Sequence, residues 1–147
     1  MSNDSIRRMP RPQDVARMTT AELRDAFLLQ NIYVAGKLTL QFTDLDRFAV
    51  GGAVPTTAPL TLENHRETGR ASFLERRELG AINTGGPGTV IVDGKSFAVE
   101  PEGCIYVGMG AKEVKFTSND AKNPAKYFIL SCPAHAAYPT VAVTTKD

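Results

Sequence analysis

The sequence predicts an all-β domain, built as a sandwich or a closed barrel, with one short helix near its N-terminus. Short runs alternate apolar and polar side chains, most clearly in Lys37–Thr43, where Leu38, Leu40 and Phe42 share one face. The chain also has 12 glycines and 9 prolines, most of them between these runs. Many short strands separated by turns are typical of sandwiches and barrels. Closure or pairing would also remove exposed sheet edges, which promote aggregation.

Residues 1–18 predict a flexible polar arm without regular structure. Pro10 and Pro12 disfavour a continuous helix or strand there. The arm is locally basic, and we interpret it as a solvated tail rather than a binding segment, since chain termini are commonly flexible. Its basic residues are Arg7, Arg8, Arg11 and Arg17.

A helix is predicted next, over Thr20 to Leu29. Thr19 and Glu22 have the spacing of a capping box, in which each side chain bonds the backbone amide of the other. Asn31 is a plausible stop. Three apolar residues recur at helical spacing and are expected to face the core: Leu23, Ala26 and Phe27.

Further strands follow the first, and an irregular surface loop is expected over Pro55 to Arg70, with His65 exposed within it. Asp93-Gly94 predicts a tight two-residue hairpin, because both central positions of such a turn need positive φ. The remaining strand-like runs are Asp46–Gly52, Thr89–Val99, Cys104–Gly108, Lys112–Thr117 and Lys126–Cys132.

Composition narrows the function classes. The chain is 147 residues long, 42% hydrophobic and 22% charged, with a net charge of +1. Such a balance argues against a nucleic-acid or membrane binder, since both need a cationic surface. No apolar run approaches the length of a membrane span, and no secretory signal is recognisable. Cys104 and Cys132 lie in apolar runs and predict buried free thiols in a cytoplasmic protein.

The most informative stretch is Phe73–Gly94, whose spacing resembles the first metal-binding box of cupin barrels. That box has two histidines one residue apart, then a glutamate and a later glycine, and Glu78 and Gly85 keep its second half. The histidine positions hold Ser72 and Leu74, or with the alternative spacing Ala71 and Phe73. None of these side chains is an imidazole.

The second cupin box is also recognisable. Gly94 is followed by Pro101–Gly103, and the histidine position after them holds Tyr106. A tyrosine there is expected to point inward, with its ring in the core and its hydroxyl bonded. Glu78 alone would hold a divalent cation weakly, because such sites usually need three protein ligands. The chain is therefore predicted to be a degenerate cupin with no metal and no cofactor of its own.

A closer resemblance covers nearly the whole chain after the arm. The motifs FLERRELG (Phe73–Gly80), YVGMGAKEV (Tyr106–Val114) and PAHAAYPT (Pro133–Thr140) resemble 5-keto-4-deoxyuronate isomerase, also called 4-deoxy-L-threo-5-hexosulose-uronate ketol-isomerase. DRFAVGG (Asp46–Gly52) and ELRDAFLL (Glu22–Leu29) occur in the matching order.

The resemblance implies a domain at residues 19–147 that corresponds to the first half of a two-cupin enzyme. The family holds zinc through three histidines and a glutamate in its second half, and none of these ligands has a matching position here. The implied reaction is ketol isomerisation of an anionic sugar, a uronate, in pectin breakdown. The chain is then either the first half of a longer protein or a stand-alone relative of that half, and alone it is expected to be inactive.

Four residues are candidate contacts for the anionic substrate. Arg76 or Arg77 could pair a uronate carboxylate through a planar guanidinium, or could instead pair with acids at a subunit contact. Lys112 is a candidate carboxylate contact or the solvated start of a strand. His135 could shuttle a proton, although ordering a turn or a domain contact is the alternative.

Two function classes remain open. The first is an isomerase of which this chain is the non-metal half, and the second is a non-catalytic cupin module for small-acid binding or subunit assembly. In either case a surface that is meant to be covered is expected to drive self-association or docking on a second cupin domain.

Overall fold

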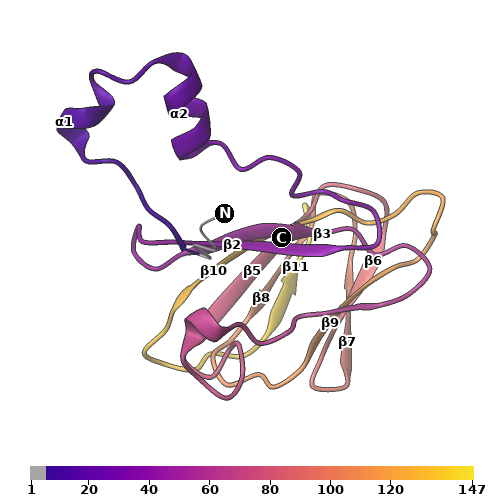
Figure 1. The fold of residues 1–147 in the computed structure, drawn as a ribbon. Helices are drawn as coiled ribbons and strands as arrows, with labels where there is room; N and C mark the ends of the chain where they lie inside the picture. Colours follow the sequence, from indigo (N-terminus) through magenta and orange to yellow (C-terminus); the bar gives the residue numbers. More distant parts are fainter. Residues whose placement is uncertain (1–5) are drawn as a thin grey trace.

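The structure, a computed structural model that describes residues 6–147, is a sandwich of two β-sheets with a helical segment at one end (Figure 1). The larger sheet has the order β1-β2-β3-β10-β5-β8-β11, and the smaller has the order β4-β9-β6-β7. Apart from the parallel pair β1 and β2, the strand pairs are antiparallel. The strands are β1 (Ile6–Arg7), β2 (Leu38–Thr43), β3 (Ala49–Ala53), β4 (Leu60–Thr61), β5 (Arg77–Asn83), β6 (Gly88–Val92), β7 (Lys95–Val99), β8 (Cys104–Val107), β9 (Val114–Ser118), β10 (Tyr127–Pro133) and β11 (Val141–Val143).

The all-β prediction is confirmed, and the predicted strand runs all contain strands. Within Thr89–Val99, the hairpin turns at Asp93 and Gly94, which have φ of 48° and 82°. Gly94 tolerates this conformation without strain because it has no Cβ. The turn fixes the register of β6 on β7, with Val92 opposite Lys95.

The N-terminal segment holds more regular structure than predicted. The part of the arm that the structure describes contains β1 and a short helix α1 (Pro12–Val15), so the expectation of no regular structure is wrong there. Residues 1–5 of the predicted arm lie outside the described residues. Helix α2 (Thr20–Phe27) begins with the predicted capping box, in which Thr19 Oγ1 accepts from the Glu22 amide and Glu22 accepts from the Thr19 amide.

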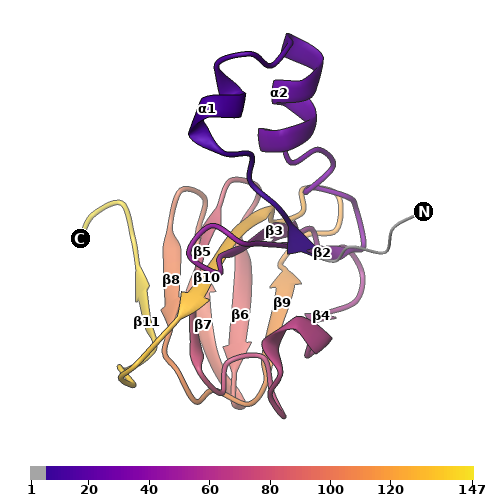
Figure 2. The ribbon, with the colours of Figure 1, turned by 60° about the vertical axis from the view of Figure 1, so that its left-hand side comes forward.

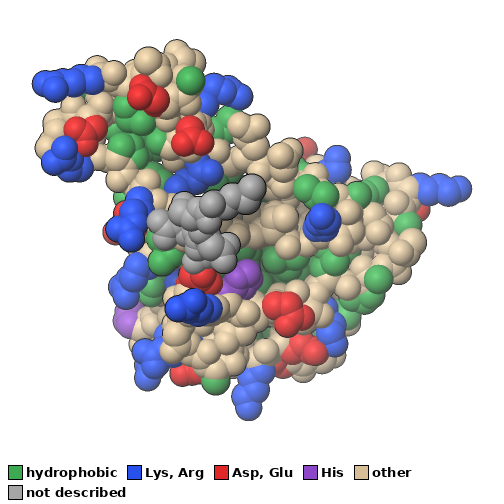
Figure 3. Space-filling model, in the orientation of Figure 1, with side chains coloured by type: hydrophobic (Ala, Val, Ile, Leu, Met, Phe, Trp, Pro, Cys, Tyr) green, Lys and Arg blue, Asp and Glu red, His purple; other side chains and the backbone are tan. Residues whose placement is uncertain are grey.

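Helix α2 does not pack on the core. None of its residues is buried, and Phe27 is 51% exposed, so the prediction that its apolar side faces the core is wrong. Figures 1 and 2 show both helices standing away from the sandwich, and Figure 3 shows hydrophobic side chains at the surface of that segment. The capping box stabilises the helix locally, but a local signal does not specify what the helix packs against.

Arg7 connects the helical segment to the sandwich. It lies on β1, which pairs with β2 through Ile6 opposite Phe42 and Arg7 opposite Thr43. Its Nη1 donates to the carbonyls of Asp25, Ala26 and Leu28, at the C-terminal end of α2. A cation there is stabilised by the carbonyls that the helix leaves unpaired.

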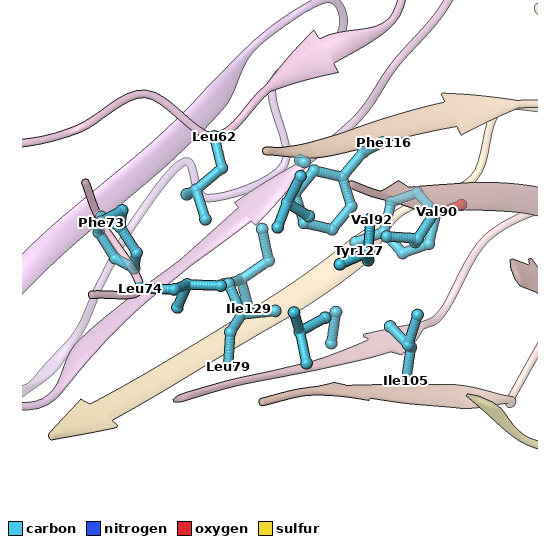
Figure 4. Close-up of a cluster of buried hydrophobic side chains, with 14 of the residues drawn as sticks. Leu62, Phe73, Leu74, Leu79, Val90, Val92, Ile105, Phe116, Tyr127 and Ile129 are labelled. Carbon is cyan, nitrogen blue, oxygen red and sulfur yellow. The ribbon is translucent and has the colours of Figure 1, made fainter. Parts of the chain in front are cut away.

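The core lies between the two sheets and is apolar (Figure 4). Leu79 and Ile129 of the larger sheet face Val90 and Phe116 of the smaller one. Tyr127 is buried among them, and its hydroxyl donates to the Thr117 carbonyl at 2.9 Å, so the polar atom is satisfied. None of the helices within residues 6–147 has the length and hydropathy needed to cross a membrane.

The segment between β3 and β5 is more ordered than the predicted surface loop. It contains β4, which pairs with β9, and the 3₁₀ turn η1 (Arg66–Thr68). Just before η1, His65 is half-buried and its ring lies 5.4 Å from Phe42 and 6.0 Å from Phe73 between centroids. The prediction that His65 is exposed is therefore wrong, because the loop folds over the open end of the core.

Candidate functional site

Strand β5 decides which charged residues face the interior. Successive side chains of a strand point to opposite faces, and the burial of β5 alternates accordingly. Arg77 is buried with Leu79, Ala81 and Asn83 on the inner face, whereas Glu78 shares the outer face with Gly80 and Ile82. Arg77 and Glu78 are neighbours in the chain but belong to two different sites.

The first site is a pocket of about 310 Å³ where β2, β5 and η1 meet, called here the arginine pocket. Its base is Arg77, and its walls include apolar side chains from Ile6, Phe42 and Pro133. One acid, Glu67, lies among the lining residues. The remaining cations are Arg47, Arg70 and Arg76.

Three hydrogen bonds to two residues hold Arg77 in place. Its Nε donates to Ser131 Oγ at 3.1 Å, and its Nη2 donates to the carbonyls of Ser131 at 2.9 Å and Arg47 at 2.7 Å. The serine hydroxyl in turn donates to the Glu78 carbonyl at 2.7 Å. These bonds join β5, β10 and the turn between β2 and β3, so the guanidinium is fixed in position.

The positive charge of Arg77 lies in an aromatic setting. Its Cζ is 5.7 Å from the Phe42 ring centroid and 5.8 Å from that of Phe73, which is the range of cation–π attraction. Burial lowers the pKa of Arg77, and the nearby positive charge of Arg47 lowers it further, while Cys132 opposes this. An arginine still remains protonated near neutral pH, since its ordinary pKa exceeds 12.

The second site lies on the outer face of the larger sheet and joins Glu78, Tyr106 and Cys132. The Tyr106 hydroxyl donates to Glu78 Oε2 at 2.7 Å, and the Cys132 thiol lies 3.6 Å from Glu78 Oε1. Register brings them together, because Cys132 is opposite Glu78 and Tyr106 is opposite Gly80. We name this group the outer triad.

The position of the outer triad shows that the predicted orientation of Tyr106 is wrong. Tyr106 was expected to point inward, but it is half-buried on the outer face, and Glu78 lies beside it rather than in the cavity. Cys104 and Cys132 are free and half-buried, not fully buried. The strands are as predicted, but the inner and outer faces are exchanged at these positions, because Arg77 and Val107 occupy the inner ones.

The two protic members of the outer triad hold their protons more tightly than usual. Burial, the hydrogen bond to Glu78 and its negative charge raise the pKa of Tyr106 to about 12. Burial first, and then the charge of Glu78, raise the pKa of the Cys132 thiol. Both groups therefore stay neutral at physiological pH, and neither is an activated nucleophile.

The positions that correspond to cupin histidines are not ligands. Leu74 is buried in the core, while Ser72 precedes β5 in a turn where its carbonyl accepts from the Glu75 amide. Within residues 6–147, no group of three or more His, Cys, Asp or Glu side chains could hold a metal ion. The residues present thus do not fit the zinc that the family resemblance places in the other half.

The structure brings together two of the four predicted substrate contacts. Arg76 and Arg77 both line the arginine pocket. His135 is exposed beyond β10, and Lys112 lies beside the Asp93 turn, where its amide donates to Asp93 Oδ1 at 2.9 Å; neither lines the pocket.

Sequence reasoning missed Arg47 and Arg70. Arg47 lies in the turn between β2 and β3, with a φ of 57°, and Arg70 follows η1 and pairs loosely with Glu75 at 4.0 Å. The predicted strand boundaries place the first of these near a turn. However, nothing in the sequence reveals which turns meet around one pocket.

A larger cavity, of about 720 Å³, is a weaker candidate for a functional site. It separates the helical segment from β2 and is lined by Arg7, Met9, Met18, Glu22 and Gln41 among others. Arg7 is already bonded to the α2 carbonyls. This cavity is the space left where α2 does not pack on the sheet.

No protein-family model matches the chain, but curated relatives do. The 4-deoxy-L-threo-5-hexosulose-uronate ketol-isomerase of Levilactobacillus brevis is 46% identical over 136 residues, which are 92% of this chain and 48% of the relative. The enzymes of that name from Formosa agariphila and Caldicellulosiruptor bescii are 47% and 43% identical, over 92% of this chain and 49% of each relative. The chain spans about half the length of the curated relatives that it matches.

Solved structures with a similar backbone include cupins. The Schizosaccharomyces pombe Cnp3 cupin domain is 14% identical, with a TM-score of 0.49 over 65% of this chain and 62% of that one. The protein Ylba from E. coli is 15% identical, with a TM-score of 0.44 over 82% of this chain and 58% of that one.

Proposed function

We propose, from the chain's membership of the 4-deoxy-L-threo-5-hexosulose-uronate ketol-isomerase family, one half of which it matches, that it is the non-metal N-terminal half of such an enzyme. The complete enzyme would carry out the ketol isomerisation of 4-deoxy-L-threo-5-hexosulose uronate. The observation that carries this proposal is the identity of 43–47% across 92% of the chain.

Ketol isomerisation moves a proton between adjacent carbons through an enediol. It needs a base of suitable pKa and an electrophile that stabilises the developing oxyanion. We assign both to the other half of the enzyme, together with the zinc ion that the resemblance implies there. This chain would contribute cations that attract an anionic sugar, with Arg76 and Arg77 as the candidate contacts.

The test compares the chain alone with a fusion. The 147-residue chain would be joined to the unmatched half of the Levilactobacillus brevis relative, and both proteins would be assayed for isomerisation with zinc supplied. We expect turnover by the fusion and none by the chain alone. A folded, inactive fusion would contradict the proposal, as would turnover by the chain alone that a mutation of one of its own residues abolishes.

The outer face of the larger sheet is the surface that we propose a second cupin-like domain to cover. Apolar side chains of β10, β5 and β11, the last separated from β5 by β8, are exposed there: Ile82, Leu130, Val141 and Val143. An apolar strip on a sheet face favours association, and relatives twice as long contain a further domain's length of chain.

This assembly predicts an effect that depends on the partner. In the fusion, Leu130→Lys should lower the melting temperature more than it does in the isolated chain, because only the fusion would bury the lysine. Thr117→Lys, on the smaller sheet, serves as the control. Equal effects of Leu130→Lys in both proteins would contradict a covered face, and a dimer of the isolated chain by light scattering would instead assign the face to a second copy.

A second candidate function, a non-catalytic module that binds a small acid, is favoured by the arginine pocket itself. It would be supported if the fusion stays inactive while the chain alone binds a carboxylate. For either function we propose a cytoplasmic location, to which the two free thiols are suited.

A further inference from the structure

The arginine pocket has one donor nitrogen that the protein does not use. A guanidinium carries five N–H donors, and Arg77 uses Nε and Nη2 for its three hydrogen bonds. No hydrogen bond within residues 6–147 involves its Nη1. In that same part of the chain, no fully buried side-chain nitrogen or oxygen lacks a partner, so Nη1 must reach the open space of the pocket.

In the part of the chain that the structure describes, no acid forms an ion pair with Arg77. The residue is only 8% exposed, and none of the salt bridges among residues 6–147 involves it. A buried cation without a carboxylate is costly, and the Phe42 and Phe73 rings offset this only in part. An anion that enters the pocket would supply the missing partner.

The surroundings select the kind of ligand. Among residues 6–147, four arginines and one acid line the pocket, and only Arg70 of these arginines has an ion pair there, a loose one with Glu75; this excess of positive charge favours anions. Its volume of about 310 Å³ is at the small end of the range for ligand pockets, and its walls at Ile6, Phe42 and Pro133 are apolar. A compact organic molecule with one charged end fits this division better than a fully charged inorganic ion does.

We propose that the arginine pocket is a binding site for a small organic monocarboxylate, whose carboxylate accepts from Arg77 Nη1 at the base while Arg47, Arg70 and Arg76 surround it. The proposal deepens the second candidate function, the small-acid module, and rests on it, whereas the fusion assay tests the isomerase half separately. The arginine pocket is a binding site and not a catalytic one, because the charged guanidinium of Arg77 donates hydrogen bonds and accepts none, so it cannot act as a base.

The test is calorimetric titration of the isolated chain with D-galacturonate and with D-galactose, which differ at the carboxylate. We expect saturable binding of galacturonate, at least about tenfold weaker binding of galactose, and a loss of affinity as salt rises. Inorganic phosphate is the third ligand. Phosphate binding as tight as that of galacturonate would overturn the carboxylate assignment, and equal binding of the two sugars would overturn the site.

Variants locate the binding. Arg77→Lys keeps the charge but removes the planar fork, and should weaken galacturonate binding by about tenfold. Arg76→Gln, exposed and outside β5, should weaken it by about threefold without altering the fold. It therefore keeps the test decisive should Arg77→Lys fail to fold. Lys112→Gln removes a cation outside the pocket and should change nothing.

Two further outcomes decide against the proposal. Binding that is unchanged in both arginine variants would move the ligand elsewhere. The other is that the wild-type chain binds none of the three ligands but forms a dimer that Arg76→Gln dissociates. This outcome would assign the pocket to an acidic side chain of a second copy.

Discussion

The two faces of β5 show how one strand separates two kinds of chemistry. On the inner face, Arg77 is fixed by three hydrogen bonds and lies beneath a pocket rich in cations. On the outer face, Glu78 binds Tyr106 and Cys132 amid exposed apolar side chains. The chain therefore places a buried cation and a half-buried anion back to back across the thickness of one sheet.

Arg77 and Glu78 are therefore adjacent in the sequence but do not form an ion pair with each other in the structure. Ser131 bridges the two residues, because its hydroxyl accepts from Arg77 and donates to the Glu78 backbone carbonyl. The inner face is suited to a small anionic ligand and the outer face to another folded surface. The following four experiments test this division, beginning with the largest expected effect.

The largest expected effect is the difference in stability lost when an apolar residue is truncated on the inner or on the outer face of β5. Leu79 is fully buried, and Leu79→Ala should lower the free energy of unfolding by about 3 kcal/mol, through lost burial and the cavity left behind. Ile82 is 47% exposed, and Ile82→Ala should lower it by less than about 1 kcal/mol. Urea unfolding of both variants measures the difference. Similar losses would mean that a partner already covers the outer face.

Removing the guanidinium should be the next largest effect. Arg77→Met leaves the carbonyls of Arg47 and Ser131 without their donor, although it also relieves the cost of a buried charge. We expect a net loss of about 2 kcal/mol in the free energy of unfolding. Arg76→Met, one residue away and exposed, should stay within about 0.5 kcal/mol of the wild type. A more stable Arg77→Met variant would mean that Arg77 is kept for binding alone.

The contrast between the faces also explains which features the sequence could predict. Alternation and turn residues locate strands, so Leu38–Thr43 and the Asp93 hairpin were predictable, and the capping box located α2. The sequence did not predict which face of the sheet the charged residues of each strand occupy. The spacing of the second cupin box predicted that Tyr106 points inward, whereas Val107 takes the inner position on β8. On β5, Arg77, Leu79 and Ala81 take the inner positions and leave Glu78 on the outer face.

The sequence analysis missed two residues of the arginine pocket, Arg47 and Arg70, for a different reason. Arg47 lies 30 residues from Arg77 and meets it only because β10 pairs with both β3 and β5. Such a contact depends on strand order, which a single sequence does not specify. The prediction that α2 packs on the core failed for the same reason. An amphipathic pattern shows that one helix face is apolar but does not specify which surface covers it.

Alkaline pH should weaken the outer triad. The pKa of Tyr106 is about 12 in the folded chain and about 10 when unfolded. Because the folded pKa is the higher, the contribution of Tyr106 to stability is complete below about pH 10 and is lost as the pH rises toward 12. Urea unfolding at about pH 9 and about pH 11 should therefore show a smaller loss for Tyr106→Phe than for the wild type.

A Glu78→Gln variant tests whether Glu78 contributes to the raised pKa of Tyr106. Absorbance of the tyrosinate should show Tyr106 ionising at lower pH in Glu78→Gln, because the charge that opposes ionisation is gone. Tyr127 remains in every variant, and burial raises its pKa too, so part of the alkaline loss persists in Tyr106→Phe. An unshifted Tyr106 in Glu78→Gln would mean that Glu78 does not contribute to the raised pKa.

The reactivity of Cys132 gives the smallest and most local test of the outer face. The pKa of its thiol is raised by burial and by Glu78, so little thiolate exists at neutral pH and alkylation should be slow. In a Cys104→Ser background, which leaves one thiol, Glu78→Gln should speed iodoacetamide labelling by about two- to threefold. Glu75→Gln, which removes an acid that faces Arg70 instead, is the matched control and should leave the rate unchanged. Equal rates in the Glu78 and Glu75 variants would show that burial alone protects the thiol, and the outer triad would then be a packing contact without electrostatic coupling.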